Sequence, residues 1–364
     1  MKEHITIKQI AKESNVSIST VSRVLNGNVP VAPEKRKRVE EIIQKHNFSP
    51  NAMARGLISH QSMTLGIVMP DITNPYFAAL FLEIERCALE AGYSVILCNT
   101  LFYVGTSQDI FKAKTEGNYF QMLIDKQVDG VVITGGEIDL ETVSDEYKQS
   151  LSRLNKAMPV VVIGEPVDGT GCIFIQREST TGIVSAVNHL RSLGHRHIGF
   201  VGGQPGVKIT SLRLNAYRAT LNALGLDYDG NLVALSDYYV KDGYAAMKEI
   251  LERNSFFSAV IAINDAVAIG AQRALADKSL RVPEDVAIVS CDQFFTGEYN
   301  VPRLTSIEQQ NAHLGRMAIM TLISAIKGIG EPVKLSFTPE LVVRESCGVQ
   351  LGVRAFPKPD RPGL

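Results

Sequence analysis

The sequence predicts an α/β protein in which a small bundle of three helices and a short linking helix precede a body with two parallel sheets. From about residue 65 onward, short β-branched runs alternate with amphipathic helical patterns, which is typical of parallel sheets flanked by helices. Before residue 60 the apolar residues recur only at helical spacing. The 364 residues also suffice for two or three domains with substantial cores.

Residues 5–27 contain two short helical patterns with a break between them at 13–15. Asn15 lies in this break, and asparagine is among the few residues that tolerate a left-handed backbone. Ser17 follows where an N-cap would accept hydrogen bonds from the first amides of the second helix. The arrangement is typical of a helix-turn-helix, and an ordinary helical hairpin with a polar outer face is the alternative.

The second of these helices presents short polar side chains and one arginine, which suit a helix that must fit into a DNA major groove. These outward residues are Ile18, Ser19, Thr20, Ser22, Arg23 and Asn26. Charge points the same way, because residues 1–60 carry ten Lys and Arg against five Asp and Glu, whereas the remainder carries 27 against 33. A basic head on an acidic body favours a polyanion at one end, although solvated surface charge explains the same split.

A third helix is predicted over 33–46, with Pro33 in its first turn. Lys35, Arg36, Lys37 and Arg38 follow, and they either contact phosphates or are simply solvated. Between 48 and 62, Pro50 ends this helix and Asn51 can cap a short helix over 52–58. That segment is either a plain interdomain linker or a hinge helix that orders on DNA, with Leu57 inserted into a minor-groove base step.

Composition excludes several classes of protein. No apolar run is as long as a membrane span, and the N-terminus lacks a signal-peptide core. The five cysteines contain no CxxC pair, which fits a reducing cytosol and suggests neither a disulfide framework nor a zinc ribbon. The HxH pair His195 and His197 is not expected to bind a metal. Because the sequence contains no GxSxG elbow, no HExxH motif and no paired carboxylates at a useful spacing, we expect no metal site, no cofactor and no catalytic constellation.

The body reads as strands and helices that alternate. Strands are predicted at 65–69, 94–98, 129–133, 159–163, 197–201, 259–263 and 286–290, and helices at 76–91, 180–193, 211–224 and 265–277. Ligands of such sheets bind in the crevice at the carboxyl ends of the strands. Two such units would face each other across a cleft.

These motifs together resemble the lactose/galactose repressor (LacI/GalR) family of bacterial transcription regulators. The resemblance begins with TIKQIAKESNVSISTVSRVLNG, SPNAMARGL and LGIVMPDITNPYF, and continues through VDGVVI, NHLRSLGHRHIGFVGG, SLRLNAY, AINDAVAIGA, VPEDVAIVSCD, PRLTSIEQ and LVVRESC. It spans about residues 4–348 in the family's order. It implies a homodimer, a helix-turn-helix bundle with a hinge helix, and two Rossmann-like subdomains of periplasmic-binding-protein type.

The resemblance also implies domain boundaries. We expect a DNA-binding head at 1–48, a hinge at 49–62, a ligand-binding core at 63–348 and a disordered tail at 349–364. Three crossings between the subdomains, near 165, 293 and 328, would pair about 63–165 with 294–327 and 166–293 with 328–348. The segments between Asn99 and Asp129 and at 136–158 look longer than the family pattern, which leaves dimer geometry and cleft access open.

For DNA, the resemblance places base-edge contacts at Ile18, Ser19 and Arg23. Arginine pairs well with guanine O6 and N7, whereas Ile18 can make only an apolar contact. Phosphate-positioning roles fall on Thr6, Ser17, Thr20, Ser22 and Asn26. Hinge contacts fall on Asn51, Ala54 and Leu57. For any one of these residues, an exposed helix position without a role in DNA binding is the alternative.

For the small molecule, the matching positions are Tyr76, Phe77, Phe174, Arg213, Tyr238, Asn264, Asp292 and Gln309. Aromatic faces can stack on a sugar or a base, and Arg with a carboxylate suits vicinal hydroxyls or a ligand acid. The alternatives are that Phe77 and Phe174 belong to the core and that Arg213 and Asp292 only pair with each other. Two departures from the family pattern, SCDQ around Asp292 and Gly164-Glu165 where an aspartate is frequent, leave the ligand unidentified.

The sequence therefore predicts a cytoplasmic, dimeric, ligand-responsive repressor that binds a near-palindromic operator and is controlled by a small metabolite, expected to be a sugar or sugar derivative. One rival is a cytosolic sugar-binding module whose head serves assembly. Steep salt dependence of DNA binding would distinguish the two, because phosphate contacts release counterions. A second rival, an α/β enzyme, would need a nucleophile–base pair in the cleft.

Overall fold

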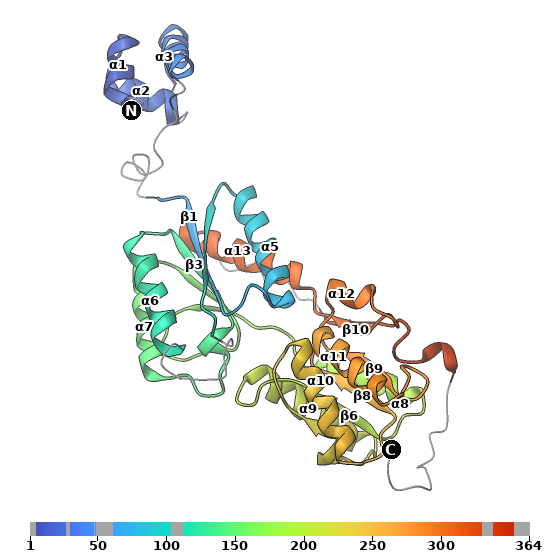
Figure 1. Ribbon diagram of the computed structural model, residues 1–364. Helices are drawn as coiled ribbons and strands as arrows, with labels where there is room; N and C mark the ends of the chain where they lie inside the picture. Colours follow the sequence, from blue (N-terminus) through green and yellow to red (C-terminus); the bar gives the residue numbers. More distant parts are fainter. Residues whose placement is uncertain are drawn as a thin grey trace. The chain divides into compact units, whose positions relative to one another are not determined.

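The computed structural model describes residues 5–26, 30–46, 48, 61–102, 112–329 and 338–352 (Figure 1). The chain divides into two compact units, Met1–Met63 and Thr64–Leu364, which are described separately below. The predicted hinge helix over 52–58 lies outside the described residues.

The N-terminal unit contains three helices, α1 (Ile7–Glu13), α2 (Ile18–Asn26) and α3 (Pro33–Lys45). They bury a small apolar core of Ile10, Ala11, Val21, Val24 and Val39. The third helix begins at Pro33 as predicted, because proline needs no amide partner in the first turn.

The corner between α1 and α2 forms as the sequence predicts. Asn15 adopts a left-handed backbone with φ 52°. Ser17 then accepts a hydrogen bond from the amide of Thr20 at 3.2 Å, which satisfies one of the free donors at the start of α2. At the start of α1, Thr6 and Gln9 form a reciprocal capping box. The caps therefore fix where each short helix begins.

The first subdomain, residues 64–175 and 311–327, is built on a five-stranded parallel sheet of order β2-β1-β3-β4-β5. Its strands are β1 (Thr64–Met69), β2 (Ser94–Asn99), β3 (Gly130–Thr134), β4 (Val160–Ile163) and β5 (Ile173–Ile175). Its helices are α5 (Pro75–Glu90), α6 (Lys112–Asp125), α7 (Asp145–Ala157) and α13 (Asn311–Lys327), with a 3-10 turn η1 (Gly136–Asp139) after β3.

Both faces of this sheet are covered. Helices α5 and α13 pack on one face and α6 and α7 on the other (Figure 1). Because side chains alternate along a strand, Ile67 of β1 enters the core under α5 and α13 while Val68 enters the core under α6 and α7.

The second subdomain, residues 181–308 and 340–351, has a six-stranded sheet of order β11-β10-β9-β8-β6-β7 in which only the β10–β11 pair is antiparallel. Its strands are β6 (Ile198–Val201), β7 (Val233–Ala234), β8 (Ala259–Ala262), β9 (Ala287–Ser290), β10 (Thr305–Glu308) and β11 (Glu340–Val342). Its helices are α8 (Thr181–Ser192), α9 (Lys208–Ala223), α10 (Val240–Glu252), α11 (Asp265–Asp277) and α12 (Phe295–Glu298), with 3-10 turns η2 (Gly230–Leu232) and η3 (Val349–Leu351).

Helices α10 and α11 approach each other at two glycines. A Cβ added to Gly243 would lie 2.2 Å from the carbonyl oxygen of Val267, and one added to Gly270 would lie 2.0 Å from that of Val240. No side chain fits at either position, so the two helices pack backbone against backbone.

The predicted crossings near 165 and 293 are wrong. Strand β5 pairs with β4, so the first sheet extends to Ile175 before the chain leaves it. Strand β10 pairs with β9, and Ile307 is buried beneath Gly182 of α8, so the chain returns to the first subdomain only between Glu308 and Asn311. The third crossing lies between α13 and β11, and residues 330–337 within it are outside the described residues.

The predicted disordered tail at 349–364 is also wrong at its beginning. Val349–Leu351 form η3 after Gly348, whose φ of 75° is easily adopted by glycine. Residues 353–364 lie outside the described residues.

Glu116 of α6 is a buried acid in the core of the first subdomain. Its side chain is 2% exposed, and burial raises its pKa to about 8. Its Oε1 lies against Gly136, where an added Cβ would be only 2.0 Å away. Within the described part of the chain, Oε2 has no hydrogen-bond partner. The folded state therefore favours the protonated carboxyl.

We expect Glu116→Gln to stabilise the protein at pH 8 and to change little at pH 5. The folded pKa lies above the unfolded value, so this group's contribution to stability is complete below about pH 4.5 and is lost as the pH rises toward 8. The gain at pH 8 should be on the order of a few kcal/mol, measured by urea unfolding at both pH values. Glu146→Gln, on the exposed face of α7, is the control, and an equal response of the two variants would contradict the assignment.

Candidate functional site

Helix α2 has one buried face and one polar face. Val21 and Val24 pack into the core of the N-terminal unit. The polar face presents the exposed or half-buried residues Ile18, Ser19, Thr20, Ser22 and Arg23, and half-buried Leu25 packs against the core. Ile18 is 49% exposed, and a large apolar side chain at the start of a polar helix face is suited to contact with a partner.

Three hydroxyls cluster at the N-terminus of α2. Ser17 Oγ lies 2.8 Å from Ser19 Oγ and 2.8 Å from Thr20 Oγ1, and each pair shares a hydrogen bond. Thr6 is exposed at the start of α1. Short hydroxyl side chains at a helix N-terminus are groups that can position phosphates.

The remaining predicted DNA contacts have side chains outside the described residues. Asn26 ends α2, but its side chain is outside the described residues. Asn51, Ala54 and Leu57 also lie outside the described residues.

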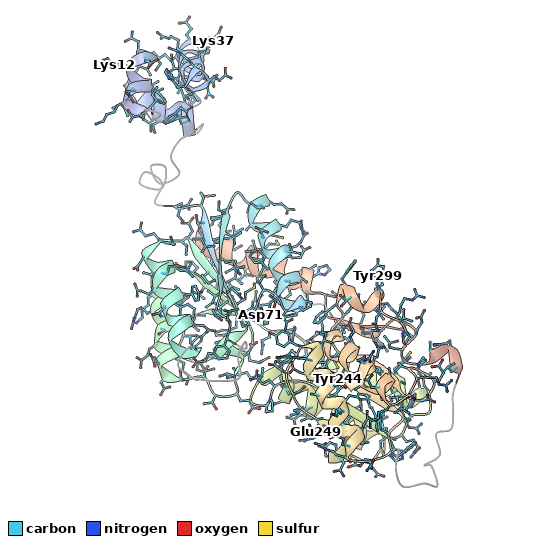
Figure 2. The ribbon with its side chains drawn as sticks, in the orientation of Figure 1. Lys12, Lys37, Asp71, Tyr244, Glu249 and Tyr299 are labelled. Atoms are coloured by element: carbon cyan, nitrogen blue, oxygen red, sulfur yellow. The ribbon has the colours of Figure 1, made fainter. Side chains whose placement is uncertain are left out.

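Helices α1 and α3 of the N-terminal unit carry exposed basic side chains. Lys35, Lys37 and Arg38 are exposed on α3, and Arg36 faces Glu40 at 3.8 Å. Figure 2 shows Lys12 of α1 and Lys37 of α3 extending outward from the unit. An exposed ion pair such as Arg36–Glu40 contributes little to stability. Arg36 can therefore exchange this partner for a polyanion at little cost.

A second candidate site is a cleft of about 90 Å³ between the two subdomains. It lies at the carboxyl ends of the parallel strands, where Thr134 ends β3 and Gly164 follows β4. Six of the eight predicted ligand contacts line it: Tyr76, Phe77, Arg213, Tyr238, Asn264 and Asp292.

The centre of the cleft is a buried ion pair. Arg213 donates from Nη1 to Asp292 Oδ2 at 2.8 Å and from Nη2 to Oδ1 at 3.0 Å, and Nη1 also donates to the Ile263 carbonyl at 2.9 Å. Burial would lower the pKa of the 1% exposed Arg213, but the facing Asp292 outweighs it and raises that pKa. In the described part of the chain, Arg213 Nε has no partner. The two side chains therefore do pair with each other, and they do so on the wall of the cleft.

The other predicted residues shape the walls. Tyr76 and Phe77 make an edge-on ring contact with centroids 4.9 Å apart. Asn264 caps α11 by accepting from the Val267 amide at 2.8 Å and donates to the Tyr238 carbonyl at 2.9 Å. Aromatic faces beside fixed polar groups can bind a small molecule in one orientation.

The structure does not bring Phe174 and Gln309 to the cleft with the other six residues. Phe174 lies in β5, and its side chain packs into the core under α6 and α7, opposite to Ile173 and Ile175. Gln309 is 3% exposed, and its Nε2 donates to the Cys291 carbonyl at 2.6 Å behind the cleft.

Four charged residues of the cleft were not predicted: Asp139, Glu165, Arg177 and Lys208. The Arg177 guanidinium lies 4.7 Å from the centre of the Tyr76 ring. Burial raises the pKa of Asp139 to about 6, against the opposing influence of Arg177 and Lys208. The only sequence signal for Asp139 is its place after Gly135-Gly136 at the end of a strand, and Lys208 precedes the predicted start of its helix at 211.

The two subdomains contact each other along one rim of the cleft. Leu140 forms an antiparallel bridge with Val207, and the Glu141 amide donates to the Gly206 carbonyl at 2.9 Å. Lys208 Nζ donates to the Ile138 carbonyl at 3.0 Å. The Ser211 hydroxyl also donates to the Glu141 carboxylate. The short segment 138–141 therefore holds the start of α9.

A further contact between the subdomains joins Tyr239, just before α10, to Asp71. The Tyr239 hydroxyl donates to the Asp71 carboxylate. Figure 2 labels Asp71 where the first subdomain faces the second. Polar contacts from separate elements therefore join the two subdomains.

Across the described ranges, no group of three or more His, Cys, Asp or Glu could hold a metal ion. No helix among the described residues is both long and apolar enough to cross a membrane.

Two family models match the chain. One, described as "Bacterial regulatory proteins, lacI family", matches residues 6–51, and the other, a periplasmic binding protein-like domain, matches residues 187–347. A curated relative, the HTH-type transcriptional repressor PurR of Pasteurella multocida (strain Pm70), is 33% identical over 350 residues, which cover 95% of this chain and 99% of the relative.

Solved structures share the fold. The Lac repressor dimer bound to operator and the anti-inducer ONPF has a TM-score of 0.81 at 23% identity, covering 95% of this chain and 99% of that one. The transcriptional regulator CelR in complex with cellobiose has a TM-score of 0.65 at 29% identity, covering 94% and 99%.

We expect Arg213→Met to destabilise the protein by about 3–5 kcal/mol, because it leaves the Asp292 carboxylate buried without a cation. Urea unfolding followed by circular dichroism measures the loss. Lys248→Met, which removes an exposed pair with Glu252, should cost less than about 1 kcal/mol. A loss as small for Arg213→Met would show that the buried pair does not stabilise the fold.

Proposed function

The chain belongs to the lacI family of bacterial regulatory proteins and is a ligand-responsive DNA-binding repressor, and from this premise we propose how it recognises DNA and its effector. The observation that carries the DNA-binding proposal is the polar outer face of α2, which is held by buried Val21 and Val24. We propose that Ile18, Ser19 and Arg23 meet base edges in the major groove. The cytoplasm is the proposed site of action, because operator DNA lies there.

Phosphate contacts would position this helix. The residues proposed for them are Thr6, Ser17, Thr20, Ser22 and Asn26, and the hydroxyl cluster at Ser17 supports this role. Asn51, Ala54 and Leu57 are proposed to contact the minor groove from the hinge, with Leu57 inserted between base pairs.

A homodimer is proposed because apolar side chains are exposed on both subdomains. Leu82 and Leu89 of α5 are 64% and 61% exposed. Phe295, Tyr299 and Val301, in and after α12, are 78%, 69% and 91% exposed, and Figure 2 labels Tyr299 at the surface of the second subdomain. Exposed aromatic and aliphatic groups of this size are typical of interfaces. Two subunits would present two recognition helices to a near-palindromic operator.

The proposed effector is an uncharged sugar or sugar derivative. Among the described residues that line the cleft, three are acidic (Asp139, Glu165 and Asp292) and three are basic (Arg177, Lys208 and Arg213). Such a balanced wall gives no net attraction for a charged ligand. Tyr76 and Phe77 offer aromatic faces to an apolar sugar face. The CelR structure, at 29% identity, is a complex with cellobiose.

The ligand is proposed to act by changing the angle between the subdomains. It would contact Tyr76 on one subdomain and Arg213 on the other, so its binding energy differs between open and closed forms. That angle would set the spacing of the two hinges in the dimer. By linkage, any effect of ligand on DNA affinity is matched by an equal effect of DNA on ligand affinity. The matched relative is a transcriptional repressor rather than an enzyme, and we propose no catalytic role for the cleft.

The first test is fluorescence anisotropy of labelled DNA from the gene's own upstream region, at two salt concentrations and with a panel of sugars. We expect tight binding that weakens steeply with salt and that one sugar shifts. DNA binding that no compound shifts would remove the proposed effector class. No binding to this DNA or to a random pool would remove the proposed DNA recognition.

Two substitutions separate base reading from phosphate contact. Arg23→Ala should cost roughly 1–3 kcal/mol of operator affinity and relax the preference at one base position. Lys35→Ala should weaken all DNA sequences alike and reduce the salt slope by about one. Competition binding with single-base operator variants measures both effects. Equal loss of selectivity in the two variants would show that Arg23 is not a base reader.

A further inference from the structure

The 3-10 turn after β3 delivers a carboxylate into the cleft. Asp139 ends η1 and lines the cleft from the side of the first subdomain. Within the described part of the chain, no hydrogen bond reaches its side chain, although Arg177 and Lys208 lie close enough to influence its charge. Its two oxygens are therefore acceptors that a ligand can use.

Gly164 leaves room for this carboxylate. A Cβ added at Gly164, directly after β4, would lie 3.3 Å from Asp139 Oδ1, closer than an ordinary contact. Because Gly164 has no side chain, the η1 turn after β3 can pack against the end of β4. Asp139 occupies the space over the strand end that a side chain at 164 would otherwise fill.

The other carboxylates and the Asn264 amide oxygen of the cleft already accept hydrogen bonds. Both oxygens of Asp292 accept from Arg213, at 2.8 and 3.0 Å. Asn264 Oδ1 accepts from the Val267 amide at 2.8 Å, and Glu165 Oε2 accepts from Gln176 Nε2 at 2.8 Å. Asp139 is consequently the carboxylate of the cleft best placed to accept hydrogen bonds from a ligand.

The second subdomain holds the turn in place. Ile138, one residue before Asp139, accepts from Lys208 at 3.0 Å. The Glu141 amide, two residues after it, donates to Gly206 at 2.9 Å. These contacts hold the backbone on either side of Asp139.

Resting on the proposed function, we propose that Asp139 is the specificity-determining ligand contact of the cleft. Its carboxylate accepts hydrogen bonds from hydroxyl groups of an uncharged polyol and repels ligands that carry a phosphate or carboxylate at that end. Asp139 and Glu165 balance Arg177 and Lys208 there, so an anion would meet no net positive charge.

The test compares full-length wild type with Asp139→Asn by isothermal titration calorimetry. The probes are D-ribose, D-glucose, D-galactose and cellobiose, with ribose 5-phosphate, glucose 6-phosphate and gluconate as anionic analogues. Wild type should bind one neutral sugar at least tenfold more tightly than its anionic analogue. Asp139→Asn should weaken the neutral sugar about 10–100-fold and reduce the discrimination to threefold or less, because the amide leaves the cleft with one more positive than negative charge.

Asp125→Asn is the matched control, since it makes the same change at an exposed site of the same subdomain, where Asp125 accepts from Gln121 at 2.9 Å. It should leave sugar affinity within twofold, and thermal unfolding of both variants should match wild type. A neutral sugar bound equally by wild type and Asp139→Asn would overturn the assignment of Asp139 while leaving the proposed function intact. A preference of wild type for an anionic analogue would overturn the ligand class. Binding of none of the probes, with DNA binding retained, would overturn both this inference and the proposed sugar effector.

Discussion

The cleft depends on one pair of opposite charges removed from water. Arg213 and Asp292 come from α9 and from the end of β9, and their bidentate contact at 2.8 and 3.0 Å joins elements far apart in the sequence. Neither charge could remain in that position alone, because the cost of burying an unpaired ion is several kcal/mol. The pair therefore requires that β9 and α9 keep their relative position. The wall of the cleft that they form is rigid for the same reason.

Across the cleft from this ion pair, the first subdomain contributes a turn that contacts the second subdomain. Segment 138–141 contacts Gly206, Val207 and Lys208 at the start of α9, the same helix that carries Arg213. A ligand in the cleft and the contacts along its rim therefore act on one helix. This shared element gives a physical route by which ligand binding can bias the angle between subdomains, since an effector acts only through contacts that differ between the two forms.

Most of the fold could be predicted because long apolar runs and helical periods are local signals. The runs that became β1, β3 and β8 each have enough β-branched residues to be recognised alone. Strands β5 and β10 have only three and four residues, and their pairing is decided by tertiary contacts, so the crossings near 165 and 293 were misplaced. In the cleft, Arg213 lies in a helix and Asp292 follows a strand that the sequence pattern predicts. Asp139 and Lys208 owe their positions to contacts between the subdomains, which no local pattern records.

The glycine contact between α10 and α11 has a mechanical consequence. Tyr239, which reaches Asp71 of the first subdomain, stands immediately before α10, and Asn264, which lines the cleft, stands immediately before α11. With Gly243 and Gly270 pressed against opposing backbone, neither helix can rotate or slip past the other without a clash. We therefore expect α10 and α11 to move as one rigid body, with Tyr239 and Asn264 just before their N-termini. A ligand that displaced Asn264 would then displace Tyr239 with it.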